Sequence, residues 1–288
     1  MADDSPQRAD LPHMLTTSEV ADLLRVKERK VYDMAAAGEI PHRRVTGKLL
    51  FPATEVSAWL SRDSSPRPAV LGGSHDPLLE WAVRESECGL SMLLDGSLDG
   101  LRRFQLGELA LAGMHIPEDA GWNEATIAAS EIEQAVLIAW AKRQQGLIVG
   151  RDVAELPGSL TDLDGLRLAL RQQGAGSRVL FDRLAVECGF EPSSAGLVVR
   201  TESEAASAVA SGEADVALGL EAAAGVFGLR FVPLVVEQFD LLIDRRAYFT
   251  QPIQTLLRFC QNASLPEKAA RLGGYDIDRL GEVRWLSR

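Results

Sequence analysis

Residues 171–189 read RQQGAGSRVLFDRLAVECG, a glycine-rich stretch followed at once by an apolar run with helical spacing. Apolar residues that recur every three to four positions predict a helix, and glycines before it permit a tight turn. The β-prone run LRLAL (166–170) precedes the glycines. We therefore predict a strand that turns directly into a helix at this point, and not a linker between domains.

The same alternation of β-prone and helical runs extends on both sides of this stretch. Before it, the β-prone runs AVLGGS (69–74) and LALAGMHI (109–116) alternate with helical runs such as DPLLEWAVRES (76–86). After it, the pattern continues as far as FVPLVVEQFDLLI (231–243). Strands that alternate with helices predict parallel sheets with crossover helices. The fold class of this region is therefore α/β, and two lobes are expected.

The first sixty residues have a different organisation. In TTSEVADLLRV (16–26), Thr16 and Glu19 have the spacing of a capping box, and the apolar residues that follow predict a helix. KERKVYDMAAAGEI (27–40) predicts a second helix that ends at Gly38. Two short helices joined by a tight turn form a candidate helix-turn-helix.

A β wing and a third helix complete this N-terminal module. IPHRRVTGKLLFP (40–52) contains two β-prone runs around Thr46-Gly47, which permits the positive φ of a tight hairpin. ATEVSAWLSR (53–62) then predicts a helix that covers the apolar faces of the first two. We expect a disordered arm at 1–13, the module at 14–62 and a Ser/Pro-rich linker at 63–67.

Charge is distributed unevenly along the chain. The 288 residues carry a net charge of −11, but residues 14–62 carry eight Lys/Arg against six Asp/Glu, a balance of +2. An excess of cations in a small module of an acidic chain favours binding to nucleic acid. The three cysteines are too few and too dispersed for a disulfide framework. No apolar run approaches the ~20 residues of a membrane span, so we expect a cytoplasmic protein without a membrane partner.

Residues 14–62 resemble the excisionase-like and MerR-like winged helix-turn-helix domains, especially in TTSEVADLLRVKERKVYDMAAAGEIP (16–41) and GKLLFPATEVSAWL (47–60). The resemblance implies that the second helix enters the major groove of double-stranded DNA while the wing meets phosphates. The implied DNA-binding residues are Lys27, Arg29, Lys30, Tyr32, Arg43, Arg44 and Lys48. The alternative is that the cations of KERK only form a solvent-exposed face of the helix.

The remainder of the chain resembles the periplasmic-binding-protein-like effector domains related to molybdate-binding proteins. The resemblance rests on SHDPLLEWAVRE (74–85), DGSLDGLRRFQLGELALAGMHIP (95–117), RQQGAGSRVLFDRLAVECG (171–189) and RTESEAASAVASGEADVALGLEAAA (200–224). It implies a type II two-lobed domain at 68–288, with lobe I at 68–149 and 235–288 and lobe II at 150–234. A small oxyanion, molybdate or tungstate before sulfate, phosphate or an organic anion, would bind between the lobes.

Hydroxyl and amide donors at helix starts are suited to bind such an anion without a large positive charge. The candidate ligand-binding residues are Ser74, His75, Ser97, His115, Gly174, Gly176, Ser177, Arg178 and Thr201. Each also has a structural explanation. The serines and the threonine can be ordinary helix N-caps, the histidines can be polar loop residues, and Arg178 can pair with Asp182.

Signatures of catalysis are missing from the sequence. GAGS lacks the Lys of a P-loop and the third glycine of a dinucleotide fingerprint, and neither G-x-S-x-G nor H-E-x-x-H occurs. We therefore expect no enzyme, no catalytic residue, no metal and no cofactor. The preferred interpretation is an oligomeric, ligand-responsive transcription regulator. The alternatives are an anion-binding protein whose N-terminal module contacts protein, and an enzyme related to molybdenum-cofactor synthesis.

Overall fold

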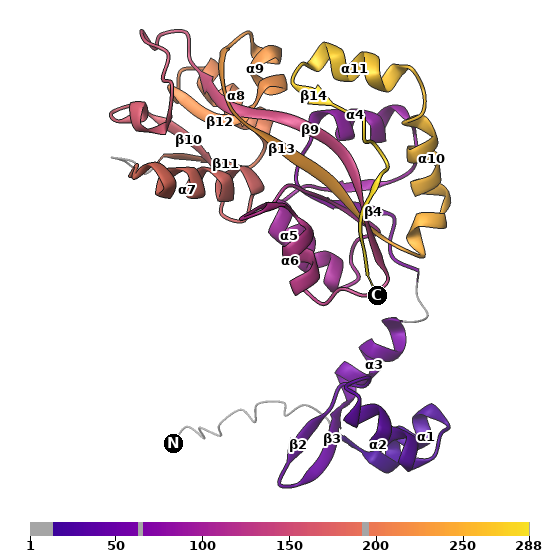
Figure 1. Ribbon diagram of the computed structural model, residues 1–288. Coiled ribbons are helices and arrows are strands. Elements are labelled where there is room, and N and C mark those ends of the chain that lie inside the picture. The colour runs from indigo at the N-terminus through magenta and orange to yellow at the C-terminus, as the bar shows by residue number, and fades with distance from the viewer. Residues whose placement is uncertain (1–13, 63–65, 192–195, 288) are drawn as a thin grey trace, which may run out of the picture. The chain divides into compact units, whose positions relative to one another are not determined.

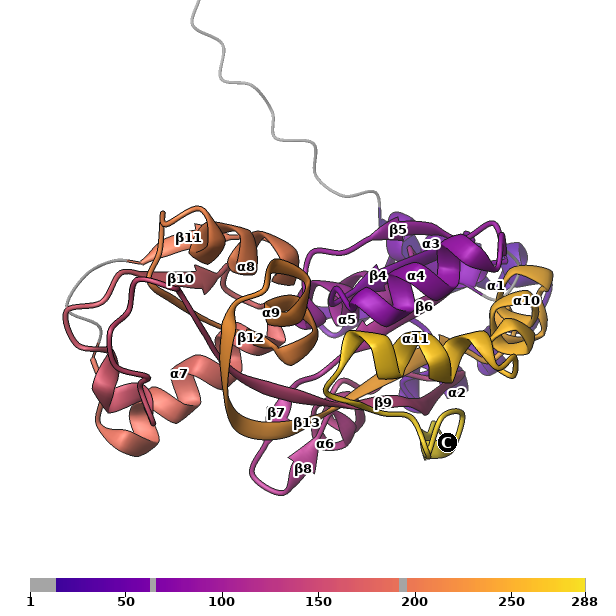
Figure 2. The same ribbon diagram turned by 90° about the horizontal axis from the view of Figure 1, so that it is seen from above.

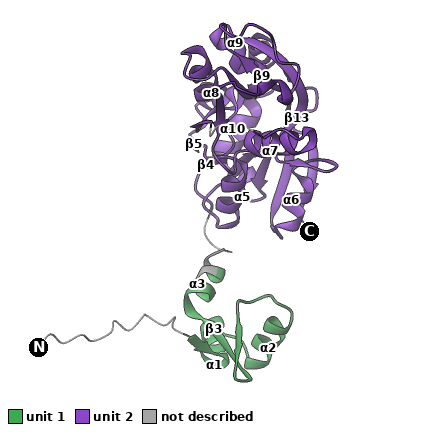
Figure 3. Cartoon of the chain, turned by 90° about the vertical axis from the view of Figure 1, so that its left-hand side faces the viewer, with its two compact units in different colours: residues 1–66 green, residues 67–288 purple. Residues whose placement is uncertain are grey.

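The chain divides into two units, residues 1–66 and 67–288, which Figure 3 shows in different colours. A computed structural model describes residues 14–62, 66–191 and 196–287. The arm expected at 1–13 and positions 63–65 of the expected linker lie outside the described residues.

The first unit combines three helices with a three-stranded antiparallel sheet (Figure 1). Its elements are β1 (Met14–Thr16), α1 (Thr17–Leu24), α2 (Glu28–Ala36), β2 (Arg43–Val45), β3 (Lys48–Pro52) and α3 (Ala53–Arg62). Both predicted helices, the hairpin and the third helix are confirmed. Strand β1 was not predicted, and it pairs with β3 so that Met14 lies opposite Pro52.

Local interactions explain why these elements begin and end where they do. The predicted capping box is present: Glu19 N donates to Thr16 Oγ1 at 3.3 Å, and Thr16 N donates to Glu19 Oε2 at 2.7 Å. Thr46 and Gly47 both have positive φ, 48° and 81°, as a tight hairpin between β2 and β3 requires. Val20, Val31, Phe51 and Val56 are buried and form the core of the unit.

The second unit begins with an α/β lobe that the C-terminal elements later join. Its elements are β4 (Val70–Gly73), α4 (Pro77–Glu85), β5 (Ser91–Leu93), α5 (Ser97–Gln105), β6 (Leu111–Met114), β7 (Pro117–Glu118), β8 (Gly121–Trp122), α6 (Glu124–Ala129), η2 (Ala247–Phe249), α10 (Gln251–Phe259), α11 (Ser264–Leu272), β14 (Tyr275–Asp276) and β15 (Val283–Leu286). Strand β4 pairs in parallel with both β5 and β6, as predicted. Helices α4, α10 and α11 pack on one face of the sheet, and α5 and α6 pack on the other.

The other lobe repeats the pattern. Its elements are η1 (Leu160–Leu163), β10 (Leu168–Arg171), α7 (Gly176–Cys188), β11 (Leu197–Val199), α8 (Glu202–Ala210), β12 (Val216–Leu220) and α9 (Glu221–Phe227). Strand β10 pairs in parallel with β11 and β12, and the glycine-rich turn after β10 leads into α7 as predicted. Helix α7 covers one face of this sheet, and α8 and α9 cover the other.

Two long strands join the lobes, as Figures 1 and 2 show. Strands β9 (Ala135–Val149) and β13 (Arg230–Asp244) pair antiparallel along their whole length. Strand β9 continues into the sheet of one lobe through β12, and β13 continues into the other through β6. Strand β9 has no counterpart among the predicted runs. The α/β class and the two-lobed architecture predicted from the sequence are confirmed.

None of the helices within the described ranges has both the length and the apolar character of a membrane span.

Candidate functional site

The candidate DNA-binding residues lie on exposed surfaces of the first unit. Lys27 is the N-cap of α2, and the side chains of Arg29, Lys30 and Tyr32 are exposed on that helix, whose buried face carries Val31. The wing adds Arg43, Arg44 and Lys48, which are also exposed. Arg43 forms an ion pair with Glu55 on α3 at 2.8 Å. Because all these cations are exposed, they are accessible to DNA.

In the second unit, three of the candidate ligand-binding residues meet where strands of lobe I end. Ser74 follows β4, Ser97 begins α5 and His115 follows β6, and all three side chains are buried. The Oγ atoms of Ser74 and Ser97 form a hydrogen bond of 2.7 Å, and His115 N donates to Ser97 Oγ at 3.1 Å. These three residues form one polar cluster at the end of the lobe I sheet.

Lobe II contributes a second buried cluster at the start of α7. Ser177 Oγ donates to Glu202 Oε1 at 3.0 Å, and the guanidinium of Arg171 donates to the same carboxylate oxygen. Glu202 is the first residue of α8 and is fully buried. The glycine-rich turn thus places a hydroxyl, a carboxylate and a guanidinium side by side.

Hydrogen bonds between the lobes hold the two clusters opposite each other. Leu98 N donates to Gly174 O at 3.3 Å, and Gln172 Nε2 donates to Asp95 O at 3.2 Å. The lobes approach closely at Gly176, because a Cβ there would lie 2.5 Å from the carbonyl oxygen of His115 and 2.6 Å from its Nε2 atom. We call the region that comprises Ser74, Ser97, His115, Gly174, Gly176, Ser177 and Glu202 the interlobe seam.

The interpretation of the serines as helix N-caps is wrong. The N-caps of α4, α5 and α7 are Asp76, Gly96 and Ala175, respectively. The hydroxyls of Ser74, Ser97 and Ser177 instead bond one another or Glu202. Only Thr201 caps its helix: it accepts from Glu204 N at 3.0 Å.

Two further candidates are occupied by local partners. His75 Nε2 bonds Glu80 Oε2 at 2.7 Å, and this hydrogen bond is the main reason why the pKa of Glu80 is lowered. Arg178 Nε donates to Asp182 Oδ1 at 2.8 Å, four residues along α7. Arg178 is therefore engaged by its own helix, as the alternative interpretation expected.

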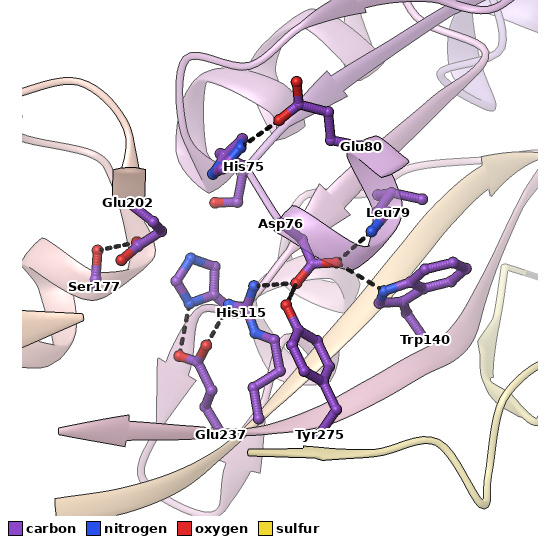
Figure 4. Close-up of polar contacts among 12 residues, drawn as sticks. His75, Asp76, Leu79, Glu80, His115, Trp140, Ser177, Glu202, Glu237 and Tyr275 are labelled. Carbon is purple, nitrogen blue, oxygen red and sulfur yellow. Dashed lines mark hydrogen bonds and ion pairs between the residues drawn. The ribbon is translucent and has the colours of Figure 1, made fainter. Parts of the chain in front are cut away.

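A network of buried charges lies next to the seam, and Figure 4 shows how it converges on Asp76 and Glu237. Arg143 on β9 donates to Asp76 Oδ2 at 2.9 Å and to Glu237 Oε1. Asp76 also accepts from Trp140 Nε1 at 3.0 Å and from the Tyr275 hydroxyl at 2.6 Å. Because an ionised carboxylate only accepts, His115 Nδ1 donates to Glu237 Oε2 at 2.8 Å.

The electrostatics of this network favour charged carboxylates. Burial raises the pKa of Glu237, but the positive charge of Arg143 and the hydrogen bond from His115 outweigh burial and lower the pKa to about 2. In the same way, Glu237 and Asp76 outweigh the burial of the Arg143 guanidinium and raise its pKa. The network connects β9, β13, α4 and β14. It therefore links β9 and β13, the two strands that join the lobes, to the seam through His115.

Sequence reasoning missed the charged residues of the site. The candidate ligand-binding residues did not include Asp76, Arg143, Glu202 or Glu237. The structure shows that all four are buried. One signal was available: Glu237 is a charged residue within the β-prone run FVPLVVEQFDLLI (231–243), and Arg143 lies between the apolar runs at the two ends of its strand. Charged residues are almost never fully buried unless they are paired, so such positions indicate a polar network.

Among the residues that the structure describes, no group of three or more His, Cys, Asp or Glu is arranged to hold a metal ion. The arrangement is that of a closed polar seam between two lobes.

Comparisons with known proteins agree with this architecture. Residues 14–64 match the model of a helix-turn-helix domain, and residues 80–261 match the model of the PBP superfamily domain. The uncharacterized protein YvgK of Bacillus subtilis (strain 168) is 25% identical over 299 residues, which span 93% of this chain and 96% of that protein.

Two solved structures share the fold of the second unit. One is a putative phosphate ABC transporter substrate-binding protein with bound phosphate from Clostridium perfringens (TM-score 0.52, 13% identity, 75% of this chain and 99% of that chain). The other is PhnD1 from Prochlorococcus marinus in complex with methylphosphonate (TM-score 0.52, 10% identity, 75% and 94%). At these identities the likeness concerns the fold alone. Since its model spans well over half of the sequence, the chain belongs to the family of the PBP superfamily domain, here preceded by a helix-turn-helix domain.

Proposed function

We propose that the protein is a ligand-responsive transcription regulator that binds double-stranded DNA through its helix-turn-helix unit and a small oxyanion between the lobes of its second unit. The observation that carries the proposal is the combination of the two units in one chain. One unit exposes cations on α2 and the wing, and the other buries a polar seam between two lobes. A regulator of this kind performs no chemistry on its ligand.

The position of the seam supports an oxyanion as ligand. Helices α5 and α7 both begin at the seam, and the first N–H groups of a helix have no acceptor within it. Such N–H groups and the helix dipole favour negative charge. The two related folds described above hold phosphate and methylphosphonate, whereas the resemblance seen in the sequence points to molybdate and tungstate. These four anions are the first candidates.

Ligand binding would control DNA binding by a shift between two states of the lobes. A ligand changes such an equilibrium only if it binds one state more tightly than the other. Leu98 and Gln172 contact the opposite lobe in this structure, and we propose that a ligand held between the lobes binds this closed state more tightly. We propose that the regulator acts as a homo-oligomer, since one small recognition module seldom provides enough specificity.

A gel-shift titration on DNA from upstream of the protein's own gene tests the proposal. We expect DNA binding that weakens with salt, is lost or weakened in Arg29→Ala and Arg43→Ala, and changes in affinity when a bound anion is added at constant ionic strength. The absence of any shift would contradict the DNA-binding role. If an anion binds but leaves DNA affinity unchanged, the protein is an anion-binding protein and not a regulator.

A thermal-shift panel identifies the ligand class in parallel. Molybdate, tungstate, sulfate, phosphate, methylphosphonate and small carboxylates are compared at matched ionic strength. A ligand that binds only the folded state raises the melting temperature, and the rise grows with the ratio of ligand concentration to Kd. A panel without any shift would overturn the oxyanion proposal.

A further inference from the structure

Arg67 is the last residue of the expected linker and the first residue of the second unit. Pro66 and Pro68 stand on either side of it and are exposed, whereas the Arg67 side chain is only 18% exposed. Proline fixes its own φ and restricts the residue before it to extended conformations. The chain therefore enters the second unit as a stiff peptide with one inward-pointing arginine.

The guanidinium of Arg67 binds three separate elements of lobe I. Its Nε atom forms an ion pair of 2.9 Å with Asp244 Oδ2, at the last residue of β13. Its Nη1 atom donates to the carbonyl oxygen of Phe104, near the end of α5, and to that of Leu109, just before β6. The guanidinium carbon also lies 4.2 Å from the centre of the Phe104 ring, a cation–π contact. We call Arg67, Phe104, Leu109 and Asp244 the linker clamp.

The carboxylate of the linker clamp is itself held in place. Asp244 Oδ1 accepts hydrogen bonds from the backbone N–H groups of Arg246 and Ala247, at 3.0 and 2.8 Å. The Asp244 side chain is only 9% exposed. A fixed, nearly buried carboxylate and a planar guanidinium form a pair of defined geometry, and solvent screens such a pair less than a surface one. The clamp is thus a firm attachment of the linker to lobe I.

Helix α5 and strand β13 both reach from the linker clamp to the interlobe seam. At the beginning of α5, Leu98 N donates to Gly174 O of lobe II, and the last turn of the same helix supplies a carbonyl to the clamp. The nine residues of α5 span about 14 Å. Strand β13 ends at Asp244 and carries Glu237, which bonds His115 of the seam. Two elements therefore connect the place where the lobes meet with the place where the linker is attached.

We infer that Arg67 couples the lobes to the helix-turn-helix unit, because it fixes the linker to two elements that also reach the seam. This role rests on the proposed function and names the residue through which the ligand acts on DNA binding. Packed elements and hydrogen-bond networks carry the coupling between distant sites. With the clamp intact, a shift of α5 or β13 on ligand binding also shifts the attached end of the linker. In this role Arg67 contacts neither ligand nor DNA, so it is a positioning residue.

The test measures the DNA affinity of the full chain by fluorescence anisotropy, with and without an anion at constant ionic strength. The anions are phosphate, methylphosphonate, molybdate and tungstate. In the wild type, we expect at least one of them to change DNA affinity by ~5-fold or more, a typical coupling between two sites.

Two variants break the linker clamp from opposite sides. Arg67→Met keeps an apolar stem against Phe104 and removes the guanidinium, and Asp244→Asn keeps an oxygen for the following turn and removes the ion pair. In both, the effect of the anion on DNA affinity should fall below ~2-fold, while the affinity for DNA alone and the calorimetric affinity for the anion stay close to those of the wild type. The double variant should lose no more coupling than either single variant, because both changes break one interaction.

Arg102→Met is the matched control. Arg102 is an exposed arginine of α5 that pairs with Asp99 on the same helix, so its loss leaves the linker clamp intact. We expect this variant to respond to the anion as the wild type does.

The outcomes separate this role of Arg67 from the proposed function. If folded Arg67→Met and Asp244→Asn keep the wild-type response, the regulator stands and the role of Arg67 is wrong. It is also wrong if Arg102→Met loses the response equally, or if the clamp variants lose anion binding itself. If no anion changes the DNA affinity of the wild type, the regulator fails and the coupling role fails with it. Should Arg67→Met not fold, as judged by circular dichroism, Asp244→Asn decides.

Discussion

His115 of lobe I lies directly against the backbone of Gly176 in lobe II. A Cβ at position 176 would lie 2.5 Å from the carbonyl oxygen of His115 and 2.6 Å from its Nε2 atom. Both distances are shorter than side chains tolerate, and His115 is held in place by Glu237 through Nδ1. Only a residue without a Cβ permits the lobes to approach this closely.

Gly176→Ala should therefore keep the lobes apart. We expect the affinity for the bound anion to fall ~10-fold or more, because the closed state that the ligand favours becomes strained. Small-angle scattering should show a larger radius of gyration in the presence of the anion than for the wild type. Gly225→Ala in α9 is the control, since the nearest atom to its added Cβ is 3.8 Å away, and it should bind normally.

Arg143→Met tests the buried charge network. The change leaves Asp76 and Glu237 buried without their shared cation, which typically costs ~3–5 kcal/mol of unfolding free energy. Urea denaturation followed by circular dichroism measures this loss. Arg84→Met removes an exposed arginine paired with Glu80 and should cost ~1 kcal/mol or less. Equal losses in the two variants would show that the network does not stabilise the second unit.

Asp240 predicts a dependence of stability on pH. Burial raises its pKa to about 6, although the hydrogen bond from Asn123 acts in the opposite direction. The folded chain thus holds this proton more tightly than the unfolded chain, so the stability contributed by protonated Asp240 is lost as pH rises from ~4 through ~6. The loss amounts to about 3 kcal/mol of unfolding free energy, and it should be absent in Asp240→Asn.

Urea denaturation at a series of pH values between 4 and 8 compares Asp240→Asn with the wild type. The variant should gain relative stability as the pH rises. Asp278→Asn, at an exposed position, should follow the wild-type curve. Parallel curves for Asp240→Asn and the wild type would contradict the assignment.

Arg44→Ala, on the exposed wing, should weaken DNA binding through the loss of a phosphate contact. The slope of log affinity against log salt is then expected to become less steep by ~0.9. Fluorescence anisotropy at several salt concentrations gives this slope. Arg102→Ala removes an exposed arginine of α5 in the second unit and should leave the slope unchanged. The same change in both variants would mean that only net charge matters.

The sequence predicted the elements that depend on near neighbours. The capping box of Thr16 and Glu19 spans three residues, and the hairpin turn depends on Thr46 and Gly47 alone. The strand–turn–helix at 168–188 follows from a β-prone run, glycines and helical spacing. Such patterns are local, because helix caps and tight turns are formed by residues a few positions apart. The alternation of strands and helices was likewise sufficient to predict an α/β fold with two lobes.

Tertiary structure alone decided which of the candidate residues meet and what each hydroxyl can donate. Tyr275 reaches Asp76 from 199 residues away, and Arg143 reaches Glu237 from 94 residues away. From its own helix alone, Ser177 was a candidate hydrogen-bond donor to an anion. The fold places Glu202 beside it, and Ser177 donates its hydrogen bond to that carboxylate. Periodicity and turn residues describe the chain over a few positions, whereas these contacts depend on how β9 and β13 join the two lobes. The sequence by itself therefore determined the two units and the position of the glycine-rich turn, and the tertiary structure determined the charges and acceptors that surround it.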